Sequence, residues 1–170
     1  MRKLLISKFF LLAIILTMGA CTHIEDDADE DPFAIFLNIK NVNQSLNLIY
    51  QDTLPLNKGH IESKVFLDVR NYSDKRIWFP DDWGLKIYRS DNNSWVEIRD
   101  SMTSFQTEDI VLAPYGDEEL RDIGAPVVDP DIPNEGHPVT IRVVVIGNVM
   151  NGDVVTDEQA AAYVDITLQP

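Results

Sequence analysis

The chain has 170 residues, with 14 Lys and Arg residues against 28 Asp and Glu residues and a formal net charge of -14. Nucleic acids and anionic lipid surfaces are bound through basic patches, so this acidic balance argues against both as partners. The length is sufficient for one domain with its own hydrophobic core.

The N-terminal segment has the pattern of a secretory signal peptide. Arg2, Lys3 and Lys8 precede an apolar run at residues 9–18. A positive start followed by a short apolar stretch is typical of a leader that is removed after export. The run is shorter than the roughly 20 apolar residues that a bilayer-spanning helix needs. We therefore expect residues 1–20 to be a signal peptide.

The only cysteine of the chain, Cys21, follows this leader directly. The sequence Met-Gly-Ala-Cys that ends at Cys21 resembles the lipobox of bacterial lipoproteins, although Leu is commoner than Met18 at its first position. In that family signal peptidase II cuts before the cysteine, and the sulfur carries a diacylglycerol. A disulfide would need a second cysteine, which the sequence lacks. The resemblance implies lipidation of Cys21 and a membrane-anchored lipoprotein of the cell envelope, extracytoplasmic, at the outer membrane or cell surface.

A segment dense in carboxylates comes next, with the sequence IEDDADEDP at residues 24–32. Such a segment cannot bury enough apolar surface to order itself, and its like charges repel one another. We therefore expect residues 21–34 to be a lipidated cysteine followed by a disordered acidic tether. Residues 35–170 are then expected to form one folded domain.

The first strand pattern of this domain is the sequence ESKVFLDVRN, in which Val65, Leu67 and Val69 share one face. Alternation of apolar and polar residues with a period of two predicts a half-buried strand. The turn residues at 71–74 and the apolar sequence KRIWF at 75–79 follow. Together these segments predict a β-hairpin.

A second hairpin is predicted around the turn DNNS at residues 91–94. Leu85 and Ile87 share a face before the turn, and Val96 and Ile98 are expected to face inward after it. The sequence EDIVLAP predicts a further short strand, which a proline ends.

The strongest strand pattern is HPVTIRVVVIGNV at residues 137–149, which is apolar on both faces and therefore predicts a central strand. Asn151-Gly152 predicts a two-residue hairpin turn. The sequence AAYVDITL predicts the last strand, at residues 161–168. A short helical turn is expected at residues 156–162, where a Thr and a Gln stand in capping-box positions.

Short strands separated by turns at intervals of roughly ten residues are typical of an all-β sandwich. The sequence VFLDVRNYSDKRIWF also resembles the strand, turn and strand of bacterial immunoglobulin-like domains such as the BsuPI-type proteinase-inhibitor fold. The later sequence VLAPYGDEEL resembles the Leu-x-Pro-Gly edge of that family. The resemblance implies an immunoglobulin-like β-sandwich of seven or eight antiparallel strands. It does not imply inhibition, because a fold does not determine a function.

No catalytic motif is recognised in the sequence. His23, His60 and His137 lack the spacing of a metal site, and no cysteine is available to complete a zinc set. Nucleophile-elbow, P-loop and HExxH patterns are also missing from the sequence. We therefore expect a protein that is not an enzyme and that has no cofactor.

Aromatic residues are concentrated near the second predicted hairpin. Trp83, Trp95 and Tyr88 are candidates for stacking on a glycan, because flat apolar rings suit the C–H surfaces of sugars. Trp83 lies in the turn PDDWG and Trp95 lies opposite the inward face, so both are expected to be exposed. The alternative is that these rings belong to the core, since aromatic residues favour strands.

Acidic residues of the sequence VVDPDIPNEG offer weak candidates for a calcium site: Asp129, Asp131 and Glu135. Carboxylates in a loop at the end of a sandwich are ligands that Ca²⁺ accepts. Solvated charged loops are the commoner case, so we expect no bound metal.

The sequence thus predicts a cell-envelope lipoprotein that acts as a non-catalytic binding or structural module for an unknown ligand. The alternative is a carbohydrate-binding accessory protein that uses exposed tryptophans. The expected partners are the membrane, through the N-terminal lipid anchor, and an envelope protein or a glycan. Nucleic acid is not expected among them.

Overall fold

The structure is a computed structural model that describes residues 31–57, 60–92, 94–98, 110–116, 121–133 and 137–169. The predicted signal peptide, Cys21 and most of the predicted tether lie outside the described residues. Residues Asp31–Pro170 form one compact unit.

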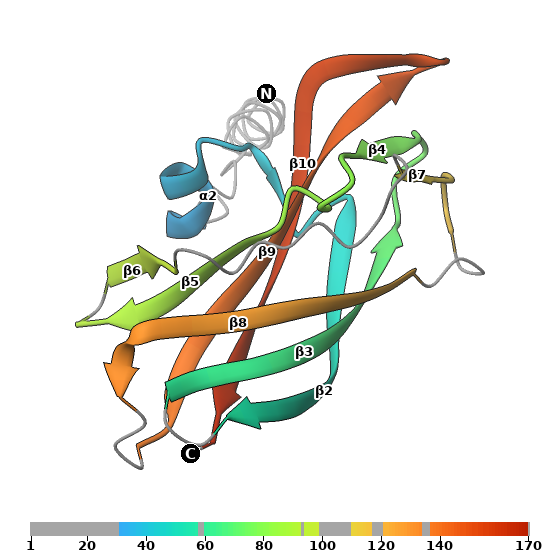
Figure 1. Ribbon diagram of the computed structural model, residues 1–170. Helices are drawn as coiled ribbons and strands as arrows, with labels where there is room; N and C mark the ends of the chain where they lie inside the picture. Colours follow the sequence, from blue (N-terminus) through green and yellow to red (C-terminus); the bar gives the residue numbers. More distant parts are fainter. Residues whose placement is uncertain are drawn as a thin grey trace, which may run out of the picture. The chain divides into compact units, whose positions relative to one another are not determined.

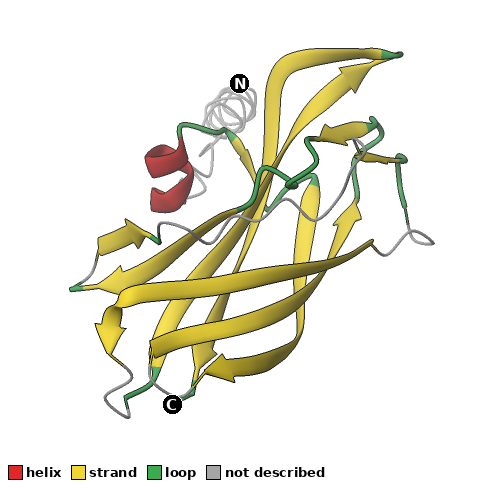
Figure 2. Ribbon diagram, viewed as in Figure 1, coloured by secondary structure: helices red, strands yellow, loops and turns green. Residues whose placement is uncertain are grey.

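This unit is an all-β sandwich of two sheets, which confirms the predicted fold class (Figures 1 and 2). The larger sheet contains seven strands: β1 (Asn41–Val42), β4 (Ile77–Phe79), β5 (Lys86–Asp91), β6 (Ser94–Glu97), β7 (Ile110–Leu112), β9 (Val139–Asn151) and β10 (Val154–Leu168). The smaller sheet contains three: β2 (Leu46–Asn57), β3 (His60–Asn71) and β8 (Arg121–Pro133). A short helix, α2 (Pro32–Leu37), precedes the strands.

The described residues hold more strands than the seven or eight predicted, and one pair is parallel rather than antiparallel. Strands β1, β2 and β8 have no counterpart among the predicted strands. Strand β1 pairs in parallel with β10, at Asn41 and Val42. Strands β2 and β8 are the two edges of the smaller sheet and contain prolines, such as Pro55 and Pro126. Edge strands tolerate proline because they have an N–H side that no neighbouring strand needs.

Strand β9 is the centre of the larger sheet, as predicted. Strand β10 pairs with it along one edge, and β5 and β4 pair with successive parts of its other edge. Val143, Val144 and Val145 of β9 are all fully buried, so both faces of this strand are covered. The burial of both faces of β9 therefore explains why its sequence is apolar at successive positions.

The predicted turn between β9 and β10 is confirmed, displaced by one residue. Asn151 pairs with Val154, so Gly152 and Asp153 form the two-residue loop. Gly152 has a φ of 62°, a conformation that glycine adopts without steric cost.

The predicted helical turn at residues 156–162 is wrong. These residues belong to β10, and Ala160, Ala161 and Ala162 pair with β9 and are fully buried. Alanine has the highest intrinsic helix propensity, but tertiary pairing with a neighbouring strand overrides a preference of this size.

The predicted hairpin between β3 and β4 is also wrong, because the two strands belong to different sheets. The turn residues after β3 instead direct the chain from one sheet to the other. The buried side-chain amide of Asn71 donates to the carbonyls of Lys75 at 2.7 Å and Ala113 at 2.9 Å. Its oxygen accepts from the backbone N–H of Ser73 at 3.0 Å. Asn71 thereby fixes the crossing between the sheets.

The second predicted hairpin is confirmed, since β5 and β6 pair in antiparallel fashion. Leu85 and Ile87 are buried on one face, as predicted. Only one of the two residues expected to face inward on the return strand does so, because Ile98 is buried whereas Val96 is exposed.

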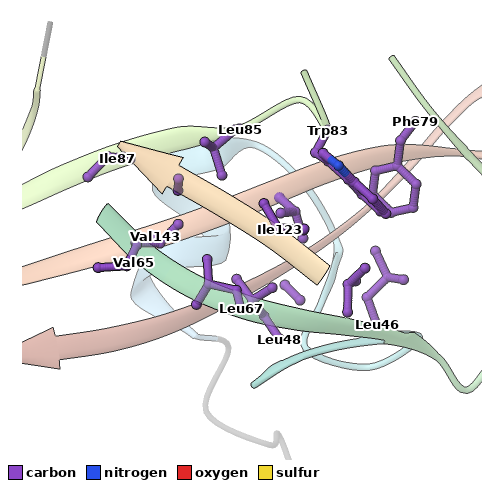
Figure 3. Packing of buried hydrophobic residues seen from close by; sticks show 14 of the residues in the cluster. Leu46, Leu48, Val65, Leu67, Phe79, Trp83, Leu85, Ile87, Ile123 and Val143 are labelled. Carbon is purple, nitrogen blue, oxygen red and sulfur yellow. The ribbon is translucent and has the colours of Figure 1, made fainter. Parts of the chain in front are cut away.

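The main core lies between the two sheets. Figure 3 shows side chains of the smaller sheet, such as Leu46 and Leu67, packing toward side chains of the larger sheet and its connections, such as Phe79 and Ile87. Val65, Leu67 and Val69 are buried in this core, which confirms the predicted inner face of β3.

A second apolar cluster covers part of the larger sheet beneath α2. It contains the buried residues Phe33, Ala34, Ile39, Val42, Tyr88, Val144 and Ala161. The predicted boundary between tether and domain after residue 34 therefore falls inside a packed helix. The folded unit begins at Asp31, because the apolar sequence PFAIFL has a sheet face to cover.

Candidate functional site

The predicted exposure of Trp83 is wrong. Its side chain is 1% exposed and packs on Phe79, with 5.1 Å between the ring centroids (Figure 3). The Trp83 N–H donates to the carbonyl of Pro80 at 2.9 Å, and its own carbonyl accepts from the N–H of Ile146 at 3.2 Å. The turn PDDWG thus lies against β9 instead of projecting into water, and Trp83 belongs to the main core.

The close approach of this turn to β9 requires glycine at the next position. Gly84 has a φ of 54°, and its N–H donates to the Asp82 carboxylate at 2.9 Å. A Cβ at Gly84 would collide with the backbone carbonyl of Ile146. The sequence PDDWG, which is typical of a surface turn, therefore forms a segment that packs between β4 and β5.

Tyr88 and Trp95 lie on the other face of the larger sheet, beneath α2. Tyr88 is 3% exposed, and its ring meets Phe33 and Phe36 edge to face at centroid distances of 5.4 and 5.5 Å. Trp95 is partly buried and meets Phe33 at 6.0 Å. The three predicted stacking residues therefore do not form one platform, because the sheet separates Trp83 from the other two.

The centre of this second face is a charged residue that the sequence analysis did not identify. The guanidinium carbon of Arg142 lies 3.9 Å from the ring centroid of Tyr163, 4.2 Å from that of Trp95 and 4.4 Å from that of Phe33. Arg142 also forms a bidentate ion pair with Asp165, in which Nε and Nη2 donate to the two carboxylate oxygens at 2.6 and 2.8 Å. We call these five residues the Arg142 cluster.

Four structural elements supply the Arg142 cluster. Arg142 and Asp165 are directly opposite each other on β9 and β10. Trp95 comes from β6 and Phe33 from α2. The Arg142 side chain is only 11% exposed, so its interactions with the rings and with the carboxylate are partly shielded from water.

Asp31 connects α2 to this cluster. One of its carboxylate oxygens accepts from the Phe33 N–H at 2.9 Å, which caps the helix, and the other accepts from the Tyr163 hydroxyl at 2.7 Å. Burial raises the pKa of Tyr163, and the hydrogen bond to Asp31 raises it further. Burial, with a smaller effect of Glu97, raises the pKa of Tyr88 to about 12.

Arg142 and Asp165 of this cluster bind each other, and the Tyr163 hydroxyl binds Asp31. The ion pair with Asp165 uses two donors of Arg142, and three rings surround its guanidinium. This arrangement suits the docking of α2 on the sheet rather than proton transfer or nucleophilic attack.

The weak calcium candidates are not brought together in a described loop. Asp129 and Asp131 belong to β8, so the predicted loop position is wrong for both, and Glu135 lies outside the described residues. Within the described ranges, no group of three or more His, Cys, Asp or Glu residues is placed to hold a metal ion.

An open hollow of about 580 Å³ lies beside the turn between β9 and β10. Arg76 bridges to this turn, donating to the Gly152 carbonyl and, at 2.6 Å, to the Asp153 carboxylate. Lys75 lies 3.7 Å from the Glu158 carboxylate on β10. These contacts connect the β9–β10 hairpin to the β3–β4 crossing, and they pair both cations that border the hollow.

A scan of protein-family models and searches of curated proteins and solved structures found no match to this chain. In the part of the chain that the structure describes, no helix has the length and apolar content to span a bilayer.

Proposed function

We propose that this protein is a lipoprotein of the bacterial cell envelope, held outside the cytoplasm by acyl chains on Cys21. The observation that carries the proposal is the order of three sequence features: a leader pattern, the sequence Met-Gly-Ala-Cys, and an acidic segment. Stable membrane attachment takes two hydrophobic signals or more, and two or three acyl chains on one cysteine meet that requirement.

In this proposal the β-sandwich is a non-catalytic binding or structural module with an immunoglobulin-like fold. The all-β architecture of two sheets supports the fold assignment. Arg76 and Arg142 are each bound to a carboxylate of β10 or its turn, which is compatible with a structural role for these two cations.

The alternative of a glycan-binding accessory protein loses its proposed surface. It needed Trp83, Trp95 and Tyr88 on one exposed platform, but Trp83 is in the main core and Tyr88 lies beneath α2. We therefore do not propose glycan stacking by these residues.

The lipoprotein proposal is tested by replacing Cys21 with Ser in the full-length precursor. Wild-type protein is expected in the membrane fraction, with the leader removed and the mass increased by acyl chains. The Cys21→Ser variant is expected to lose that mass and to leave the membrane fraction, because a hydroxyl does not accept the diacylglycerol. Thr22→Ser is the matched control and should behave as wild type. An unmodified thiol with an intact leader in the wild-type protein contradicts the proposal.

A further inference from the structure

The exposed side of α2 presents two large apolar side chains. Ile35 is 64% exposed and Phe36 is 56% exposed, whereas Phe33 and Ala34 of the same helix are buried against the sheet. The helix sequence PFAIFL contains no charged residue. Single exposed apolar residues are common on protein surfaces, so exposure alone does not indicate a binding surface. The position of Ile35 and Phe36 in the chain does.

That position is directly after the proposed anchor. Pro32, the first residue of α2, is eleven residues from Cys21. A fully extended chain spans at most about 3.3–3.6 Å per residue, so α2 lies within about 40 Å of an acylated Cys21. The anchor therefore keeps the apolar pair at a high effective concentration at the bilayer surface, where a weak contact becomes populated.

The apolar pair is also held in place before any lipid is met. Phe36 stacks on Phe33 at a centroid distance of 5.3 Å, and Phe33 packs on Arg142. Asp31 caps the start of the helix, and the N–H of Asn38 donates to the Ile35 carbonyl at 3.1 Å at its end. An ordered surface loses less conformational entropy on binding than a disordered one.

The acidic segment before α2 argues against an anionic lipid surface. The segment before Pro32 is rich in carboxylates, which are repelled by anionic headgroups. An uncharged helix with exposed aromatic and aliphatic side chains suits the interfacial region of a zwitterionic bilayer, where aromatic rings are favoured.

We propose that Ile35 and Phe36 insert into the headgroup region of the zwitterionic bilayer leaflet that holds the acylated Cys21. This inference rests on the proposed lipidation. The contact sets the orientation of the sandwich on the membrane, because α2 is fixed to the larger sheet through the Arg142 cluster.

The test uses the lipidated, full-length mature protein in phosphatidylcholine vesicles. Acylation consumes the only native thiol, so Phe36→Cys provides a single site for an environment-sensitive NBD label. We expect its emission to shift to shorter wavelength on the vesicles and to be quenched by brominated phosphatidylcholine. The control is Val154→Cys, at a residue that is 67% exposed beside the β9–β10 turn, and its label should report water.

Two variations separate the outcomes. Adding Ile35→Ser to the labelled Phe36→Cys protein should reduce the quenching, and replacing part of the lipid with phosphatidylglycerol should reduce it at low salt. If the protein floats with the vesicles but the two labels give the same emission, the membrane contact is overturned and lipidation stands. A label at position 36 that is shifted but unquenched by brominated lipid shows contact with protein, which also overturns the inference. Protein that does not float overturns both proposals.

Discussion

The two apolar clusters of this domain are built in different ways. The main core lies between two sheets and receives buried side chains from strands along most of the described chain. The cluster beneath α2 lies on one face of one sheet, and its cover is a helix of six residues. Beside the second cluster, the rings of Phe33, Trp95 and Tyr163 surround the guanidinium of Arg142.

The difference separates global from local stability. Removing a side chain from the main core affects contacts between both sheets, so its cost appears in the unfolding of the whole domain. The contacts of α2 involve a few residues near one end of the described chain, and such regions open in local equilibria well below the global free energy of unfolding. Four predictions test this separation, beginning with the largest effect.

Trp83→Ala should lower the free energy of unfolding by about 3–5 kcal/mol, the usual cost of truncating a buried Trp or Phe. Trp95→Ala should cost less, because Trp95 is partly buried and packs only on the second face. Urea denaturation followed by circular dichroism measures both. Equal losses for the two variants would contradict the distinction between the clusters.

Asp165→Ala should lower the free energy of unfolding by about 1–3 kcal/mol, because it leaves the largely buried Arg142 guanidinium without its carboxylate. The double variant Arg142→Met with Asp165→Ala should recover part of this loss, since an apolar side chain of similar length keeps the ring contacts without an unpaired charge. A double-mutant cycle by urea denaturation checks the coupling, and additive effects would rule it out.

Asp31→Ala should cost about 1 kcal/mol, the typical effect of removing a helix N-cap. It also removes the hydrogen bond to the Tyr163 hydroxyl. We expect faster amide hydrogen exchange in residues 33–39, with exchange in β9 unchanged. Asp52→Ala, at an exposed position on β2, is the control and should leave α2 as protected as in the wild type. Faster exchange across the whole sandwich after Asp31→Ala would show that α2 is not a separate unit.

The fourth prediction concerns Tyr88, whose ionisation should change the free energy of unfolding only at alkaline pH. The folded-state pKa of Tyr88 is raised to about 12, above the value of about 10 in an unfolded chain. Its contribution to stability is therefore fully present below pH 10 and is lost as the pH rises from about 10 to 12. Tyr88→Phe should reduce the dependence of the unfolding free energy on pH in this range. Absorbance at the phenolate band should show one fewer late-titrating tyrosine.

The strands with strong alternation could be predicted from the sequence, and the central position of β9 followed from its apolar residues on both faces. The partners of the strands could not be predicted. A turn sequence such as the one after Asn71 is compatible with a hairpin and with a crossing between sheets. Its residue types favour a bend, but they do not determine which strand the next segment pairs with. The hydrogen bond from Asn71 to Ala113 is part of the crossing, and this partner is distant in the sequence.

The Arg142 cluster was hidden for a similar reason. Counting back from the tight turn at Gly152 places Tyr163 opposite Arg142. The pairing shifts by two residues between Val155 and Gln159, so Asp165 occupies that position instead. A shift of two residues keeps every side chain on the same face of the sheet. The alternation of apolar and polar residues therefore does not reveal the shift.

The exposure of Trp83 was predicted incorrectly because a turn with Pro, Asp and Gly usually lies at the surface. Here β4 and β5 pair with different parts of the same edge of β9, and the turn fills the interval between them. The burial of this turn depends on how β4 and β5 pair with β9, so it could not be predicted from the residue types of the turn alone.

The docking of α2 also has a mechanical consequence. Any pull transmitted from an N-terminal attachment reaches the folded unit at Asp31, and it meets the six residues of α2 before it meets any strand. Unwinding a helix into extended chain increases the rise per residue from about 1.5 Å to about 3.4 Å. Such a force therefore reaches α2 first, and unwinding of this helix lengthens the chain before any strand has to separate.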